Sequence, residues 1–169
     1  MEKHEAILAA LSSWGVEYNL TEHAPAMGMD DLPPVEEKLG ARFFRNLFLC
    51  NRQKTRFYLL LIVGDKPFRT AEVSKKLGVA RLSFGDAQTL HDMLGVTPGA
   101  VNPLSLIFDP EKKIQLVIDA DILQWERACM HPGVNTASIV VSMRDFREKI
   151  LPALGHEPTV LTLTGSSEQ

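Results

Sequence analysis

The chain has 169 residues, the size of one domain, and its 45% hydrophobic and 23% charged residues are near the average for globular proteins. This composition excludes a disordered chain, a collagen-like fibre and a coiled coil, and no apolar run approaches the ~20 residues that a membrane-spanning helix needs. The net charge of −3 weighs against a nucleic-acid partner when the chain is taken as a whole.

The first half of the sequence predicts short helices around one apolar hairpin. Residues 57–63 are apolar on both faces, which is typical of a central strand covered on both sides. In chain order we expect a helix over 7–14 that Gly15 ends, a short strand over 16–23, a loop over 23–34, a short helix ending at Gly40, a hairpin of 43–50 and 56–63, a helix over 71–77, a strand over 81–84, and a helix that Asp86 caps and Leu94 ends.

The second half predicts more strands than helices. The expected elements are a loop over 96–103, a second hairpin of 104–108 and 113–118 around Asp109-Pro110, strands over 126–130 and 137–143, a closing helix over 144–154, and a strand over 160–163. Hairpins interspersed with short helices favour an α+β fold with a mixed, mostly antiparallel sheet flanked by short helices. We expect a single domain over residues 1–163 and a frayed tail over 164–169.

The charges are unevenly distributed along the chain. Residues 38–64 carry six basic side chains and no acidic one, which leaves −9 for the remainder. Such a basic window either solvates a hairpin and protects an edge strand, or contacts the phosphates of a polyanion. The six residues are Lys38, Arg42, Arg45, Arg52, Lys54 and Arg56.

Polar residues that packing does not explain occur in four short segments. Arg45 and Asn46 interrupt an apolar strand, and because a strand alternates its faces they cannot both enter an apolar layer. One of them is expected at an edge or in a cleft, unless the arginine is simply exposed and the asparagine holds a turn. Ser83, close to Asp86, is a further candidate, with helix capping as the alternative.

The other two segments are loops. Residues 99–103 form a rigid run of small side chains after Pro98, which either walls a small pocket or is an ordinary tight connection. The segment over 129–136 contains His131, Asn135 and Thr136 together with one cysteine. It has no second Cys/His pair, so we expect no metal site and no cofactor, and we expect the cysteine in the core.

These segments, in this order, resemble the YbaK/ProX family of aminoacyl-tRNA deacylases, which is related to the editing insertion of bacterial prolyl-tRNA synthetase. The likeness runs from about residue 6 to residue 163 and is closest to the free-standing, alanyl-specific branch. The matching stretches are RNLFLCN with RFYLLLIV, LGVARLSFGDAQTLHDMLGVTPGAVNPLSLIFD, VIDADIL, HPGVNTAS and LGHEPTVLTL. The resemblance implies an editing-domain fold with a barrel-like core.

The implied activity is trans-editing, the hydrolysis of alanine wrongly esterified to the acceptor end of proline tRNA, in the cytoplasm and with prolyl-tRNA synthetase as a transient partner. By this resemblance Asn46, His131 and the backbone of Gly99 and Ala100 surround the ester. Arg45, which stands where the family usually has lysine, holds the terminal nucleotide. The remaining expected substrate contacts or supports of the pocket are Asn102, Pro103, Ser83, Asn135 and Thr136.

Three alternatives stay open at this stage. The same site with another pocket wall would remove a different small amino acid, such as cysteine, serine or threonine. A non-catalytic RNA- or DNA-binding module would need the basic window but not the small pocket, and the sequence lacks the aromatic platform expected of sequence-tolerant single-strand readers. A structural or interaction protein with a degenerate pocket is the third alternative.

Overall fold

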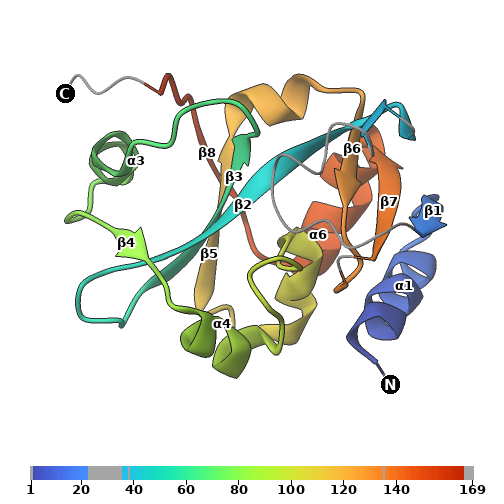
Figure 1. The fold of residues 1–169 in the computed structure, drawn as a ribbon, viewed down its shortest axis with the longest axis horizontal. Coiled ribbons are helices and arrows are strands. Elements are labelled where there is room, and N and C mark those ends of the chain that lie inside the picture. Colours follow the sequence, from blue (N-terminus) through green and yellow to red (C-terminus); the bar gives the residue numbers. More distant parts are fainter. Residues whose placement is uncertain (1, 23–35, 38, 135, 166–169) are drawn as a thin grey trace.

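The computed structural model describes residues 2–22, 36, 37, 39–134 and 136–165. In chain order its elements are α1 (Lys3–Ser13), β1 (Asn19–Glu22), β2 (Arg42–Cys50), β3 (Phe57–Val63), α3 (Thr70–Leu77), β4 (Ser83–Phe84), α4 (Ala87–Leu94), the 3₁₀ helix η2 (Pro103–Phe108), β5 (Ile114–Asp119), the 3₁₀ helix η3 (Ala120–Gln124), β6 (Arg127–Met130), β7 (Ala137–Ser142), the consecutive helical segments α5 (Met143–Asp145), η4 (Phe146–Ile150) and α6 (Leu151–Leu154), and β8 (Thr159–Leu161). The strands form one mixed sheet in the order β1-β7-β6-β2-β3-β5-β8, with β4 paired to β2 (Figure 1). The predicted α+β fold is confirmed.

The hairpin of β2 and β3 forms the centre of the sheet. The two strands pair antiparallel from Phe44 opposite Val63 to Cys50 opposite Phe57. On its other edge β3 pairs in parallel with β5, and its residues 58–63 are all buried. The apolar character of both faces of this strand follows from its central position, as the sequence predicted.

The predicted second hairpin is wrong. Residues 103–108 form η2, and β5 pairs in parallel with β3 and β8. The physical reason is a strong helix-start signal. The Asn102 side chain accepts a backbone N–H of the first turn, Ser105 accepts the N–H of Asn102, and Pro103 supplies the first helical residue.

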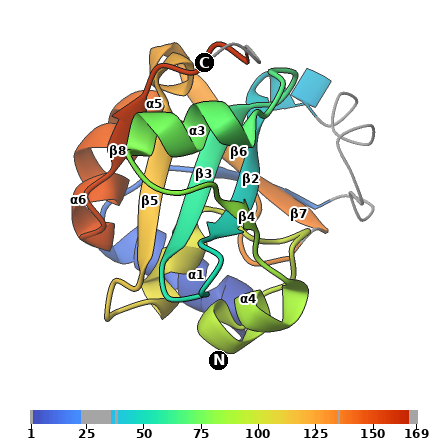
Figure 2. The ribbon, with the colours of Figure 1, turned by 90° about the vertical axis from the view of Figure 1, so that its left-hand side faces the viewer.

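The core is divided between the two faces of the sheet. On one face Val73 of α3 packs with Leu60 and Val117 of the central strands, and Figure 2 shows α3 crossing in front of β3 and β5. On the other face α1 and the closing helical segments cover the larger cluster, which includes Ile7 and Phe146. No helix in the described part of the chain is long and apolar enough to cross a membrane.

Most of the remaining predicted elements are present with shifted boundaries. The helices expected over 71–77 and 144–154 correspond to α3 and to the run from α5 to α6, and the side chain of Asp86 caps α4 by accepting the N–H of Thr89 at 2.7 Å. The loop predicted over 23–34 lies outside the described residues.

The chain after β8 is tied to α3, although residues 164–169 were expected to fray. The buried carboxylate of Glu72 accepts the N–H and the hydroxyl of Thr164 at 2.8 and 2.7 Å and the N–H of Gly165 at 3.1 Å. Burial alone would raise the pKa of Glu72, but these hydrogen bonds and one from Lys76 lower it to about 2. The ionised carboxylate therefore fastens the first two residues of the expected tail to the domain.

Replacing Glu72 by glutamine should weaken the fold in a pH-dependent way. Because the folded-state pKa is lowered from 4.5 to about 2, the carboxylate stabilises the protein above about pH 4.5, and this contribution disappears as the pH falls toward about 2. We expect Glu72→Gln to reduce the free energy of unfolding at pH 7 by about 1–3 kcal/mol. Urea unfolding between pH 7 and pH 2 measures it.

The exposed Glu111, which makes a 3.3 Å ion pair with Lys113, provides the matched control. Glu111→Gln should leave both the stability and its pH dependence close to those of the wild type. If the free energies of unfolding of Glu72→Gln and the wild type changed in parallel with pH, the stabilising role of the ionised Glu72 carboxylate would be contradicted.

Candidate functional site

Strand β2 has a gap in its pairing along one edge. Its first edge pairs with β3 over residues 44–50. Its second edge pairs with β6 at residues 42–43 and with β4 at residues 49–50, and no strand of the described chain pairs with it in between. Arg45 and Asn46 lie in this gap, between the residues paired with β6 and those paired with β4.

Arg45 and Asn46 belong to opposite faces of the sheet because side chains alternate along a strand. Asn46 is opposite Leu61, which packs in the larger cluster, and Arg45 is opposite Ile62, which packs under α3. The side-chain oxygen of Asn46 is buried and accepts no hydrogen bond from any described residue. Since buried polar atoms are nearly always paired, this oxygen marks a place for a donor from water or a ligand.

A network of charges fixes the surroundings of Arg45. Its guanidinium donates to the backbone carbonyl of Lys66 at 3.3 Å. The ammonium of Lys66 in turn contacts the fully buried Asp119 at 2.9 Å, Asp121 at 2.8 Å and the carbonyl of Leu163 at 2.8 Å. Burial alone would lower the pKa of Lys66, but the hydrogen bonds to Asp121 and Asp119 raise it above its ordinary value. The carbonyl that directs Arg45 is therefore part of a rigid cluster.

His131 follows β6 and lies on the same face as Arg45. Cys129 of β6 is opposite Phe43 of β2, and the ring centroid of His131 lies 5.1 Å from that of Phe43. The Nδ1 atom of His131 lies 3.1 Å from the carbonyl oxygen of Ala137. A carbonyl can only accept, so Nδ1 carries a proton, and in the neutral ring Nε2 is the acceptor.

Asn102 connects the loop over residues 99–103 to the loop that begins with His131. Its side-chain amide donates to the carbonyl of His131 and, at 3.2 Å, to that of Ala100. Its side-chain oxygen accepts the N–H of Leu104 at 2.9 Å. The structure thus brings the two predicted loops together. The buried Asn102 side chain is engaged with the protein at both polar atoms, so it positions the two loops, and its expected contact with a substrate stays a prediction.

The other residues of the predicted pocket wall differ in exposure. Gly99 is exposed, Ala100 is buried, and Pro103 is buried as the first residue of η2. The N–H of Ala100 donates to the carbonyl of Thr97 at 3.0 Å. This N–H is therefore used within a turn, and the predicted role of the Ala100 backbone as a donor to the ester does not fit.

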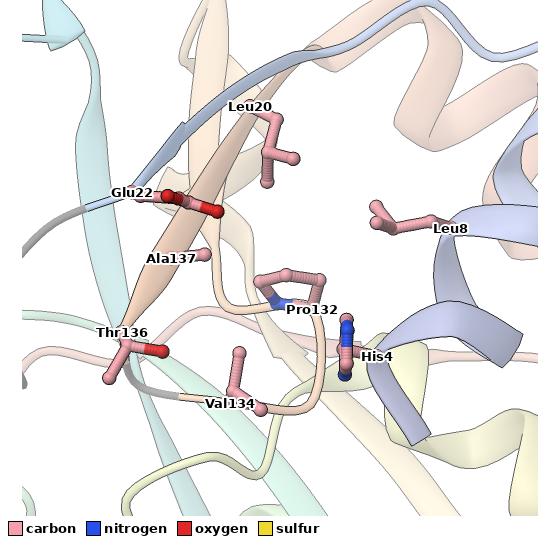
Figure 3. A pocket seen from close by; sticks show the side chains of 8 residues that line it. All are labelled: His4, Leu8, Leu20, Glu22, Pro132, Val134, Thr136 and Ala137. Carbon is pink, nitrogen blue, oxygen red and sulfur yellow. The ribbon is translucent and has the colours of Figure 1, made fainter. Parts of the chain in front are cut away.

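Thr136 lines a pocket on the opposite side of the sheet from His131. The pocket has a volume of about 390 Å³ and is lined by His4, Leu8, Leu20, Glu22, Pro132, Val134, Thr136 and Ala137 (Figure 3). Ala137 shares its face with Ile139 of the larger core cluster, which places the pocket on the α1 side. Asn135 lies outside the described residues.

Ser83 lies at the far end of the β2 gap, opposite Cys50. It lines a separate pocket of about 410 Å³, together with Phe68, Thr70, Arg81, Leu82 and Phe84. The structure therefore does not bring Ser83 next to His131.

Cys129 is a core residue, as expected. It is 1% exposed, and burial together with the nearby Glu36 raises the pKa of its thiol to about 12, so it is protonated at neutral pH. Among the described residues there is no group of three or more His, Cys, Asp or Glu side chains that could hold a metal ion.

The basic window forms two separate groups. Arg42 and Arg45 lie near the β6 end of β2, whereas residues 52–56 make the exposed turn between β2 and β3. Arg45 shares the sheet face of His131, and Arg42 lies on the other face, 4.5 Å from the ring centroid of Trp125. Lys38 lies outside the described residues. The first group can contact a phosphate of a ligand held in the gap.

Sequence reasoning missed the contacts that hold the site in place. The signal for the Lys66–Asp119 pair was available, because the charged Asp119 directly follows the apolar residues 116–118 at the end of β5. The unpaired oxygen of Asn46 had no signal in the sequence, since it depends on the interrupted pairing of β2.

The open edge of β2 has the unpaired amide oxygen of Asn46 on one face of the sheet and the Arg45 guanidinium and His131 imidazole on the other. A phosphate-bearing ester that lies across this edge, together with a water, is the kind of ligand that such groups suit. The model of the aminoacyl-tRNA editing domain matches residues 23–149. The chain belongs to this family, which confirms the resemblance predicted from its motifs. It is an aminoacyl-tRNA deacylase, a hydrolase of the ester that joins an amino acid to tRNA.

Two relatives cover nearly the whole chain. The prolyl-tRNA editing protein ProX of Acetoanaerobium sticklandii is 28% identical over 156 residues, which are 92% of this chain and 94% of that protein. The prolyl-tRNA synthetase associated domain-containing protein 1 of Xenopus laevis is 28% identical over 161 residues, or 93% and 95% of the two chains.

Solved structures share the fold at lower identity. A proposed trans-editing enzyme for prolyl tRNA synthetase superposes with a TM-score of 0.73 at 16% identity, covering 97% of this chain and 98% of the other. The hypothetical protein APE2540 superposes with a TM-score of 0.71 at 20% identity, covering 95% and 98%.

Replacing Asn102 by alanine should destabilise the protein. The change removes the link between the two loops and leaves the carbonyls of Ala100 and His131 without this donor. We expect the free energy of unfolding to fall by about 2 kcal/mol or more, since unpaired buried polar groups are costly. Urea unfolding measures it, and unchanged stability together with a raised KM would instead support the predicted substrate contact.

Proposed function

We propose that this chain removes alanine from mischarged proline tRNA. The names of the relatives support proline tRNA as the carrier. The observation that carries the proposal is the buried, unpaired side-chain oxygen of Asn46 in the β2 gap. An α-ammonium group or a water would supply the missing donor, and both are present where an aminoacyl ester is hydrolysed.

The reaction is attack by water on the ester carbonyl carbon. A new C–O bond forms, the bond to the ribose oxygen breaks, and that oxygen takes the proton which the water loses. In the proposal Asn46 accepts from the α-ammonium group, Nε2 of His131 orients the water, and Arg45 holds the phosphate of the terminal nucleotide. The N–H of Ala100 already donates to Thr97, so in the proposal the N–H of Gly99 stabilises the oxyanion.

The described residues of these loops include no obvious carboxylate base. An aminoacyl ester is already activated, so positioning a water and stabilising the oxyanion supply much of the rate. The neighbouring hydroxyl of the terminal ribose is a further group that can accept or relay the proton. This chemistry uses no metal or cofactor.

In the proposal, the enzyme selects a small amino acid because the loop that walls the pocket leaves too little room for a larger side chain. A synthetase pocket for proline rejects a smaller side chain weakly, because a missing methylene changes binding by only ~1–3 kcal/mol. A second site rejects the larger proline by steric overlap. The loop that contains Ala100 is held by Asn102 at several points, so it would not widen readily to admit a ring.

The substrate would be met at its acceptor end in the cytoplasm, with prolyl-tRNA synthetase as a transient partner that supplies the mischarged tRNA. The test is a deacylation assay on proline tRNA charged separately with alanine, cysteine, serine or proline. We expect rapid loss of the alanyl ester and no loss of the prolyl ester above the uncatalysed rate. A preference for serine or cysteine would identify a different specificity, and tRNA binding without turnover would favour a non-catalytic module.

Replacing Asn46 by alanine should separate catalysis from stability. Because the variant removes an unpaired buried oxygen, the free energy of unfolding should stay the same or rise. We expect kcat/KM for the alanyl ester to fall about 100-fold or more. Single-turnover deacylation and urea unfolding measure the two effects.

Arg144→Ala is the control, since Arg144 is exposed and pairs only with Glu148 in the described residues. It should retain full activity. Full activity of both His131→Ala and Arg45→Ala would contradict the assignment of the site.

A further inference from the structure

An exposed aromatic side chain lies at the second end of the β2 gap. Phe84 is 60% exposed and is the most exposed large hydrophobic residue of the described chain. Its ring centroid lies 5.4 Å from that of Phe68, and the two planes are tilted by 57°. Phe68 packs against the cluster under α3, so it holds one side of Phe84 while the other side remains open to solvent.

Phe84 belongs to the same face of the sheet as Arg45. It is opposite Leu49 of β2, and directly paired residues of neighbouring strands share a face. Leu49 in turn shares its face with Arg45, four residues earlier along β2. At about 3.3 Å per residue, Phe84 therefore lies roughly 13 Å along the strand from Arg45.

The charge around Phe84 suits an anionic partner. The pocket beside it, of about 410 Å³, is lined by one cation, Arg81, and by no carboxylate. The nearest acidic residue along the chain, Asp86, is already occupied by the N–H of Thr89 and by Lys54. The lining of this pocket is therefore positively charged, although the protein as a whole has a net charge of −3.

We propose that Phe84 is a stacking platform for a base of the single-stranded acceptor end, just before the nucleotide that carries the ester. This proposal rests on the proposed function, because it takes the tRNA end as the ligand of the β2 gap. An exposed aromatic ring next to an arginine is the common arrangement for stacking an unpaired base and contacting its phosphate. Ser83 adds a hydroxyl group that can contact the sugar and phosphate, whereas the Thr70 hydroxyl donates to the carbonyl of Leu82 at 2.7 Å.

The platform and the site would act on adjacent parts of one strand. Arg45 would bind the terminal nucleotide in the gap, and Phe84 would stack a preceding base at the β4 end of the same gap. Stacking would therefore strengthen binding of the polynucleotide without touching the ester. The expected signature is a change in KM with little change in kcat.

The test compares two substrates of different length. One is proline tRNA carrying the amino acid that the wild type removes, and the other is the same amino acid esterified to adenosine alone. Phe84→Ala should raise KM for the charged tRNA about 10-fold, within the range that one stacked base supplies, and leave kcat/KM for the adenosine ester unchanged. Phe84→Tyr should behave as the wild type because it keeps the ring.

Leu20→Ala is the matched control, since Leu20 is a 45% exposed apolar residue on β1 at an edge of the sheet. It should leave both substrates unaffected. Equal kinetics of Phe84→Ala and Leu20→Ala on charged tRNA would overturn the proposal, as would an equal loss on both substrates. A shift in oligomeric state caused by Phe84→Ala, followed by light scattering, would overturn it in favour of a protein contact.

A binding measurement separates this proposal from the proposed function. If the wild type hydrolyses no aminoacyl ester but binds a labelled oligonucleotide with the tRNA 3′ sequence, and Phe84→Ala weakens that binding, the platform stands and the deacylase function fails. If the wild type hydrolyses the ester and Phe84→Ala binds uncharged tRNA as tightly as the wild type, the platform fails and the function stands.

Discussion

The interrupted pairing of β2 is the constraint on which the arrangement of the site depends. One edge of the strand is satisfied by β3 along its length, which keeps it in the sheet, while the other edge is satisfied only at its two ends. The gap leaves Arg45 and Asn46 at an open strand edge, while the pairing with β3 keeps β2 in the sheet. The pairing at one end leads through β6 to His131, and the pairing at the other end leads to Phe84. A continuous strand in this position would have covered the residues that the chemistry uses.

The buried polar groups of the domain divide into two kinds. Glu72 and Asp119 accept several hydrogen bonds each, and Asn102 uses both polar atoms of its side chain. These groups stabilise the fold because their desolvation is compensated. The oxygen of Asn46 has no such compensation among the described residues. An uncompensated acceptor surrounded by well-satisfied ones is consistent with a ligand that supplies the missing donor, and with stability given up at a functional position.

The sequence predicted the central hairpin, the helices α1, α3 and α4, the closing helical run and the family correctly, because those depend on local periodicity and on motifs. It predicted a hairpin at residues 104–118 wrongly, since the capping by Asn102 and Ser105 outweighed the apolar pattern. The order of the motifs identified Asn102 as a candidate residue but did not show that it links two loops. Tertiary packing decides which atoms a side-chain amide contacts. The Phe68–Phe84 pair was missed for the same reason. The two residues come from different elements, and neither segment alone suggests an aromatic platform.

Charge and geometry together restrict where an RNA can bind. With +6 confined to residues 38–64 and −9 elsewhere, the long-range field of the protein repels a polyanion over most of its surface. The structure divides the positive window further: among its described residues, only Arg45 shares the sheet face of His131 near the β6 end of β2, since Arg42 lies on the other face against the ring of Trp125. Binding must therefore rely on short-range contacts near the gap rather than on a broad basic surface. Such contacts can reach an unpaired strand end but not a long duplex, so the charge distribution itself favours a ligand presented at the end of an RNA.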